Sequence, residues 1–162
     1  MNDIEEVTFC GLYCGLCASR RRLPQQAATL RQTLIQEGYD RGYFDVPGLE
    51  TVFAAFWEGL NYLIDQPCPG CRAGGGNPDC AIRTCVREQG VVACPLCAEY
   101  PCARLNILEN YPLRSADGQR MQVIGIEQWA AEQEARARRG LAYTDVRFSE
   151  ETWASHDSSC CV

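Results

Sequence analysis

The feature that most constrains this chain is the grouping of its cysteines. Ten of the twelve lie between residues 10 and 102, in motifs with the spacings C-x3-C-x2-C, C-x2-C, C-x4-C and C-x2-C-x4-C. In chain order these are Cys10, Cys14 and Cys17, then Cys68 and Cys71, then Cys80 and Cys85, and finally Cys94, Cys97 and Cys102. Two thiols separated by two residues can face one ion from the same side of a turn. The spacing therefore predicts that these ten cysteines bind metal, since free cysteines buried for packing have no reason to gather in such pairs.

Length and charge restrict the remaining classes of protein. The 162 residues fit one domain with a modest core, and the net charge of −6 argues against a nucleic-acid backbone as partner. The first residues lack the features of a signal peptide, and the longest apolar stretch, Thr51 to Ile64, is too short to cross a membrane. We therefore expect a cytoplasmic protein without membrane or nucleic-acid partners, in a compartment that disfavours disulfides.

The pattern of apolar residues predicts a mostly helical fold with short β elements. The cysteine motifs predict zinc-ribbon-like knuckles that pack on these helices in a small, metal-stabilised domain. We expect a cysteine-rich metal-binding domain over residues 1–140 and a C-terminal extension over 141–162. The predicted helices cover residues 23–38, 49–64, 78–89 and 101–110, with one or two more over 115–139, and the predicted strands cover 91–93 and 6–9.

Two apolar stripes at helical spacing are predicted to face a core. The first is formed by Leu49, Val52, Phe53, Phe56, Trp57, Leu60, Leu63 and Ile64. The second places Met121, Ile124, Trp129 and Ala130 inward. The segment from Pro67 to Cys102 differs, because Pro, Gly and Cys dominate it and leave too little apolar surface to order it. We expect bound metal to stabilise that segment instead.

The spacing leaves the sharing of ions among the cysteines open. Twenty-two residues separate the pair Cys68 and Cys71 from the pair Cys94 and Cys97, as in the four-cysteine site of a zinc ribbon. In a rival assignment, Cys80 and Cys85 join Cys94 and Cys97. The opening motif supplies three ligands from Cys10, Cys14 and Cys17, and its fourth would come from Cys80, Cys85 or Cys102.

The quoted motifs resemble a family of cysteine-rich bacterial and archaeal proteins of unknown function. In that family C-G-x-x-C-x-x-C opens the domain, as residues 10–17 do here, and C-x-x-C-x-x-[FY]-P-C closes it, as residues 94–102 do. The resemblance extends over about residues 8 to 130, and Trp129 fits the family's C-terminal helix. It implies a small metal-binding protein and no particular reaction.

We expect about two zinc ions in closed sites of four cysteine ligands each, in a structural or interaction module with a protein partner. A structural zinc site contributes about 10–16 kcal/mol of apparent binding energy, which is comparable to the roughly 5–15 kcal/mol of a whole domain. An iron–sulfur protein holding [4Fe–4S] clusters for electron transfer or redox sensing is the alternative, and a thiol-redox enzyme is the third hypothesis. The sequence assigns no catalytic residue, and closed sites favour a protein that is not an enzyme.

Three residues near the C-terminus remain without a role. His156 is the only histidine, so a His-dependent catalytic site would have to use it. Cys160 and Cys161 resemble the Cys-Cys tail of mercuric reductases over two residues alone, and a flexible tail is the simpler interpretation.

Overall fold

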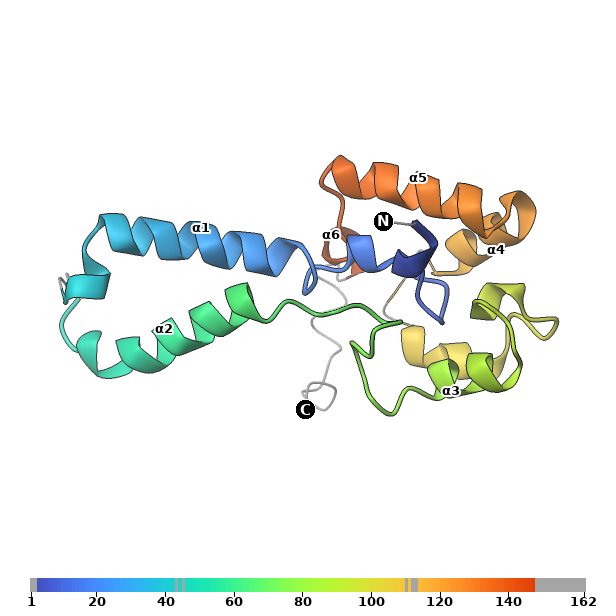
Figure 1. The fold of residues 1–162 in the computed structure, drawn as a ribbon, viewed down its shortest axis with the longest axis horizontal. Helices are drawn as coiled ribbons and strands as arrows, with labels where there is room; N and C mark the ends of the chain where they lie inside the picture. Colours follow the sequence, from blue (N-terminus) through green and yellow to red (C-terminus); the bar gives the residue numbers. More distant parts are fainter. Residues whose placement is uncertain (1–2, 43, 45, 110, 112–113, 148–162) are drawn as a thin grey trace. The chain divides into compact units, whose positions relative to one another are not determined.

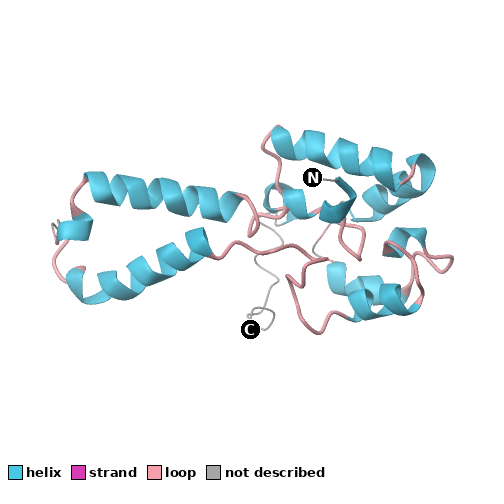
Figure 2. Cartoon of the chain, viewed as in Figure 1, coloured by secondary structure: helices cyan, strands magenta, loops and turns pink. Residues whose placement is uncertain are grey.

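The computed structural model describes residues 3–42, 44, 46–109, 111 and 114–147. The chain forms two compact units, one from residues 1–17 and 69–162 and the other from residues 18–68. The fold is mostly helical (Figures 1 and 2). The α-helices are α1 (Arg22–Gln36), α2 (Glu50–Asp65), α3 (Ala81–Glu88), α4 (Arg114–Ile124), α5 (Ile126–Arg138) and α6 (Thr144–Arg147). The 3-10 helices are η1 (Asp3–Glu6), η2 (Cys14–Leu16), η3 (Tyr39–Arg41), η4 (Cys94–Leu96) and η5 (Ala103–Leu108).

The unit of residues 18–68 is a helical hairpin in which α1 and α2 lie side by side (Figure 1). Helix α1 ends before Gly38, whose φ of 82° suits a glycine and turns the chain. A hydrogen bond of 3.0 Å from Arg31 Nη1 to Asn61 Oδ1 joins the two helices. The ring of Phe53 packs against Phe44 and Trp57, with centroids 5.0 and 5.3 Å away. Both helices were predicted from their apolar spacing, and the prediction is confirmed.

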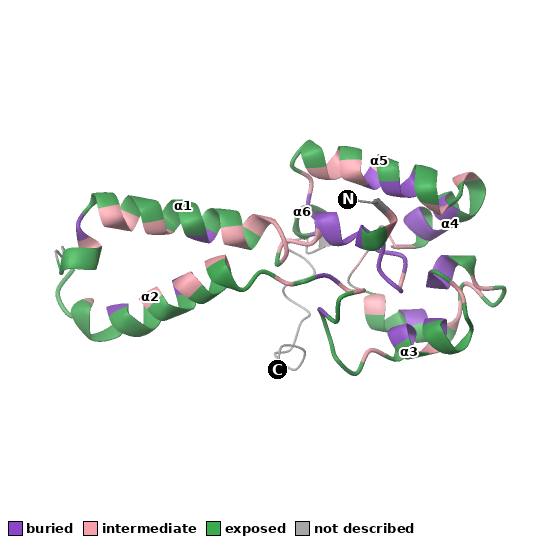
Figure 3. Ribbon diagram, in the orientation of Figure 1, coloured by how far each residue is buried: buried purple, intermediate pink, exposed green. Residues whose placement is uncertain are grey.

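The prediction that the whole apolar stripe of α2 faces a core is only partly correct. Phe53 and Leu60 are buried, with 9% and 5% of their surface exposed. Val52, Phe56 and Leu63 are 58%, 43% and 41% exposed, so one side of the stripe has no cover within the hairpin (Figure 3). Periodicity identifies an apolar face, but a hairpin of two helices has only one neighbour to cover it.

The second unit has a core beneath α4 and α5. The segment 115–139 forms two helices rather than one, because Gly125, with φ 82° and ψ 159°, interrupts them. Met121, Trp129 and Ala130 are fully buried as predicted, and Ile124 packs against the same cluster. The rings of Trp129 and Tyr13 meet edge to face, with centroids 6.2 Å apart. This core connects the opening cysteine segment to the C-terminal helices.

The chain between α5 and α6 also contributes to this core. Tyr143 is buried, and its phenol oxygen accepts the backbone N–H of Tyr13 at 2.9 Å. The boundary at residue 140 between a metal-binding domain and an extension stays a prediction. His156, Cys160 and Cys161 lie outside the described residues.

The predicted strands do not form in the described parts of the chain. Val7 and Tyr13 make an isolated β-bridge, and Glu6 belongs to a 3-10 helix instead. The other segment, 91–93, is extended at Ala93. Cys94, which follows it, donates one backbone hydrogen bond to the Phe9 carbonyl. The two segments therefore meet, but a single hydrogen bond does not make a ladder.

Helices in the cysteine-rich segment are shorter than predicted. Helix α3 occupies the predicted range 78–89 only from Ala81 to Glu88, and Gly90 follows it with φ 64°. Within the predicted range 101–110, the 3-10 helix η5 covers Ala103–Leu108. Zinc-ribbon knuckles remain an expectation. No helix in the described ranges is both long and apolar enough to span a membrane.

Candidate metal centre

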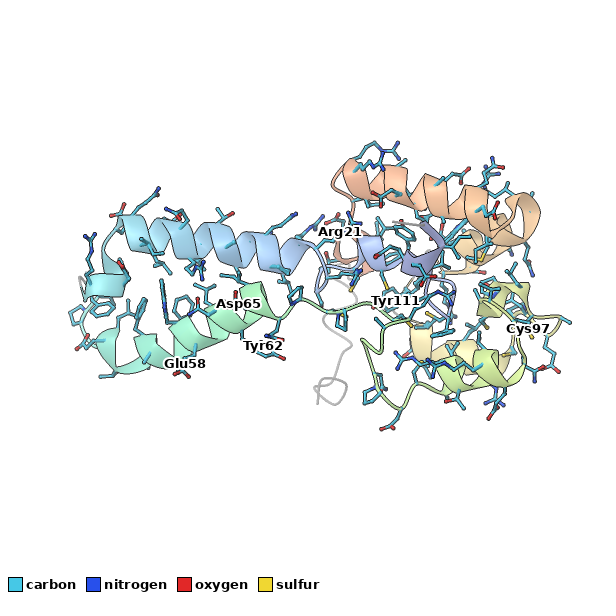
Figure 4. The ribbon with its side chains drawn as sticks, in the orientation of Figure 1. Arg21, Glu58, Tyr62, Asp65, Cys97 and Tyr111 are labelled. Atoms are coloured by element: carbon cyan, nitrogen blue, oxygen red, sulfur yellow. The ribbon has the colours of Figure 1, made fainter. Side chains whose placement is uncertain are left out.

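Four of the predicted ligands line one small cavity in the unit that contains α3. Cys85 comes from α3, Cys94 begins η4, Cys97 directly follows η4, and Cys102 immediately precedes η5 (Cys97 is labelled in Figure 4). The cavity between them measures about 20 Å³, and Ile82, Val86 and Val91 supply apolar walls. A space of this size holds one water-sized sphere.

The thiols in this group influence one another electrostatically. Burial, followed by repulsion from Cys102 and Cys97, raises the pKa of Cys94 to about 11. Without metal, this thiol is therefore protonated at neutral pH. A metal ion would remove the cost of burying the thiolate by replacing the proton, which is how thiolate ligands normally bind.

Three more cysteines form a second group. Cys10, Cys71 and Cys80 all pack against the apolar cluster of Phe9, Ile82, Val86, Cys94 and Leu105. Burial raises the pKa of Cys10, and the neighbouring Cys71 and Cys80 raise it further. The Cys10 sulfur lies 3.0 Å from Thr8 Oγ1. Residues far apart in the sequence thus pack three thiols against one apolar cluster, which also contains Cys94 of the first group.

A buried cation lies beside the second group. Arg83, on α3, is only 8% exposed, and it donates a hydrogen bond to the Gly75 carbonyl. Its Nη2 is 3.9 Å from the Cys71 sulfur, while its Nε has no hydrogen-bond partner. Among the described residues no carboxylate pairs with this guanidinium. Burying an unpaired charge is costly, and anionic thiolates around a metal would provide the missing countercharge.

The opening and closing cysteine segments of this centre are held together at the backbone. The Cys94 N–H donates to the Phe9 carbonyl at 2.8 Å. Gly11 passes so close to Pro95 that an added Cβ would lie 2.7 Å from Pro95 Cδ and closer still to Cγ. Gly11 also has a φ of +86°, which side chains rarely adopt. Cys10 lies between these two contacts.

Three predicted ligands fall outside these two groups. Cys14 is buried, and its sulfur accepts the backbone N–H of Cys71 at 3.3 Å. Cys17 ends the opening segment, and Cys68 ends the hairpin unit, where its carbonyl accepts a hydrogen bond from Arg20 at 2.7 Å. Neither Cys17 nor Cys68 lines the cavity described above.

The cavity favours a different sharing of ligands from the zinc-ribbon pairing. It places Cys85 and Cys102 with Cys94 and Cys97, whereas Cys80 lies with Cys10, and the assignment of cysteines to ions stays a prediction. Within the described residues, no three His, Cys, Asp or Glu side chains are close enough together to hold an ion. Binding would therefore require these thiols to turn toward one another.

Sequence reasoning missed two residues of this centre. Arg83 had no special place in any motif, and only its burial beside Cys71 draws attention to it. Gly11 is the glycine of the C-G-x-x-C motif, and a glycine there could have indicated that the backbone passes close to another segment, which here is Pro95.

The comparisons with known proteins give a family and no activity. The model of a family described as "Protein of unknown function (DUF3795)" matches residues 6–107, a range that holds all ten cysteines of the four motifs. No curated protein and no solved structure matches the chain. Because the matched residues make up more than half of the sequence, the chain belongs to the DUF3795 family.

Proposed function

We propose that this protein binds about two zinc ions through cysteine thiolates, in closed sites that stabilise a non-catalytic interaction module. The observation that carries the proposal is the cavity of about 20 Å³ lined by Cys85, Cys94, Cys97 and Cys102. Four sulfur ligands complete the tetrahedral shell that zinc prefers and leave no position for a substrate. The opening C-G-x-x-C-x-x-C motif and the closing cysteine motif are consistent with this role.

The surroundings of the second group support metal binding independently. Arg83 is a buried guanidinium without a carboxylate partner among the described residues, and it lies beside Cys71. Three neutral thiols would leave its charge uncompensated, whereas thiolates bound to a metal would balance it. Cys10, Cys71 and Cys80 are therefore the proposed core of the second site.

The interaction role has separate support on the hairpin unit. Val52, Phe56 and Leu63 are spaced along α2 so that they fall on one face, and each leaves more than a third of its surface exposed. Apolar residues gathered in this way are typical of surfaces that contact other proteins.

The metal proposal is tested by purifying the full chain without oxygen and measuring its metal content and visible spectrum. We expect a colourless protein with about two zinc ions per chain. A brown protein containing iron and inorganic sulfide would replace zinc with the iron–sulfur alternative. A folded protein without metal would contradict both and favour a thiol-redox enzyme.

A matched pair of variants locates the first ion. Cys97→Ser removes a cavity-lining sulfur and should reduce the zinc content by at least one ion per chain. Cys160→Ser changes a cysteine outside the four motifs and should leave the zinc content unchanged. Equal zinc content in the wild type and in Cys97→Ser would remove this cavity as the site.

A further inference from the structure

The two thiol groups lie next to each other. The hydrogen bond of 2.8 Å from Cys94 N–H to the Phe9 carbonyl and the close approach of Gly11 to Pro95 hold residues 9–11 against residues 94–95. A second cavity, of about 180 Å³, is lined by both Cys10 and Cys102, so the groups also adjoin on this side. Cys10 and Cys94 are therefore neighbours, although 83 residues separate them in the sequence.

Cys94 has contacts in both groups. It lines the first cavity together with Cys85, Cys97 and Cys102. It is also a buried member of the apolar cluster against which Cys10, Cys71 and Cys80 pack. The first group has four sulfurs, but the second has three, and a closed tetrahedral site requires a fourth.

We propose that the two ions form one binuclear cluster in which the Cys94 sulfur bridges them. This inference rests on the proposed metal-binding function. One ion is bound by Cys85, Cys94, Cys97 and Cys102, and the other by Cys10, Cys71, Cys80 and the same Cys94. Each of the seven thiols releases its proton to solvent as its sulfur bonds the metal, so no oxidant or reductant is needed.

The balance of charge favours a shared sulfur. Seven thiolates around two divalent ions carry three net negative charges, whereas two separate sites with eight thiolates carry four. Buried charge is costly without a partner, and Arg83 is the buried cation that lies beside this group. A bridging thiolate thus gives both ions four sulfurs with one fewer buried negative charge.

The experiment is one-dimensional and homonuclear-correlated ¹¹³Cd NMR of the full chain loaded with ¹¹³Cd²⁺ under reducing conditions. We expect two equally intense resonances, each split into a doublet, because scalar coupling between two cadmium nuclei passes through a shared sulfur. Two unsplit resonances would overturn the bridge and leave the proposed metal-binding function intact. A chain that takes up no cadmium and no zinc would overturn the function itself.

Two variants test which cysteine completes the second site. Cys14→Ser should retain two cadmium ions and the splitting, because the bridging Cys94 leaves no coordination position for Cys14, whose sulfur accepts the Cys71 N–H. Cys94→Ser should remove the splitting and shift both resonances. If Cys14→Ser loses one ion, Cys14 is the fourth ligand and the bridge is wrong. The wild-type spectrum decides the question even if Cys94→Ser fails to fold.

Discussion

The substitution Gly11→Ala tests the contact that brings Cys10 to Cys94. Two costs add at this position. Its φ of +86° is unfavourable for a residue with a side chain, by about 1–2 kcal/mol. The new methyl group would also lie 2.7 Å from Pro95 Cδ, and overpacking of this kind costs about 1–3 kcal/mol. We therefore expect Gly11→Ala to lower the free energy of unfolding by about 2–5 kcal/mol.

Gly74→Ala is the matched control for backbone strain alone. Gly74 has nearly the same φ, +91°, but no atom lies within 4 Å of its added Cβ. This control should therefore lose only about 1–2 kcal/mol. Both variants and the wild type would be unfolded in urea, with far-UV circular dichroism as the signal and with zinc and a thiol reductant present. If Gly11→Ala is no less stable than Gly74→Ala, residue 11 does not pack on Pro95 and the proposed adjacency of the two thiol groups loses its support.

Three further predictions concern the core, the charge balance and pH. Trp129→Ala should lower the free energy of unfolding, measured in urea, by about 3–5 kcal/mol, because Trp129 is fully buried. Val123→Ala, at a side chain that is 79% exposed, should change the free energy of unfolding by less than about 0.5 kcal/mol. Arg83→Gln should weaken zinc binding about 10- to 100-fold in competition with a chromophoric chelator, whereas Arg87→Gln, whose guanidinium lies 5.1 Å from the ring centroid of Phe9, should have little effect. Zinc affinity should fall as pH falls, by about tenfold per pH unit for each thiol proton displaced. The reason is that the raised pKa of Cys94 keeps that thiol protonated at neutral pH in the metal-free chain. An affinity independent of pH between about 6 and 8 would contradict thiol ligation.

The local parts of the fold could be predicted from the sequence. Apolar residues at helical spacing indicated α1 and α2, and glycines ended helices where expected, at Gly38 and Gly90. Trp129 was correctly placed in a core for the same reason. These features depend on neighbours within a few residues, which a sequence displays directly.

Features that depend on distant neighbours could not be predicted. Ala93 is extended as a strand would be, yet its segment finds no partner for a ladder among the described residues. The exposed side of the α2 stripe, including Phe56, shows that periodicity does not reveal what covers a face. For the metal centre the ten cysteines were visible in the sequence. Their partners depend on the meeting of residues 9–11 with 94–95, and no local pattern reports that contact.

The central claim is that bonds between sulfur and metal order the cysteine-rich segment, beyond what the small apolar cluster around Ile82 and Val86 supplies. Amide hydrogen exchange, followed by mass spectrometry before and after removal of metal with a chelator, measures this most directly. We predict that residues 69–102 lose their protection when the metal is removed, while the helices α4 and α5 retain theirs because they pack on the core around Trp129, to which that segment contributes only Ala93 among the buried residues. Unchanged protection of residues 69–102 in the metal-free chain would contradict the claim.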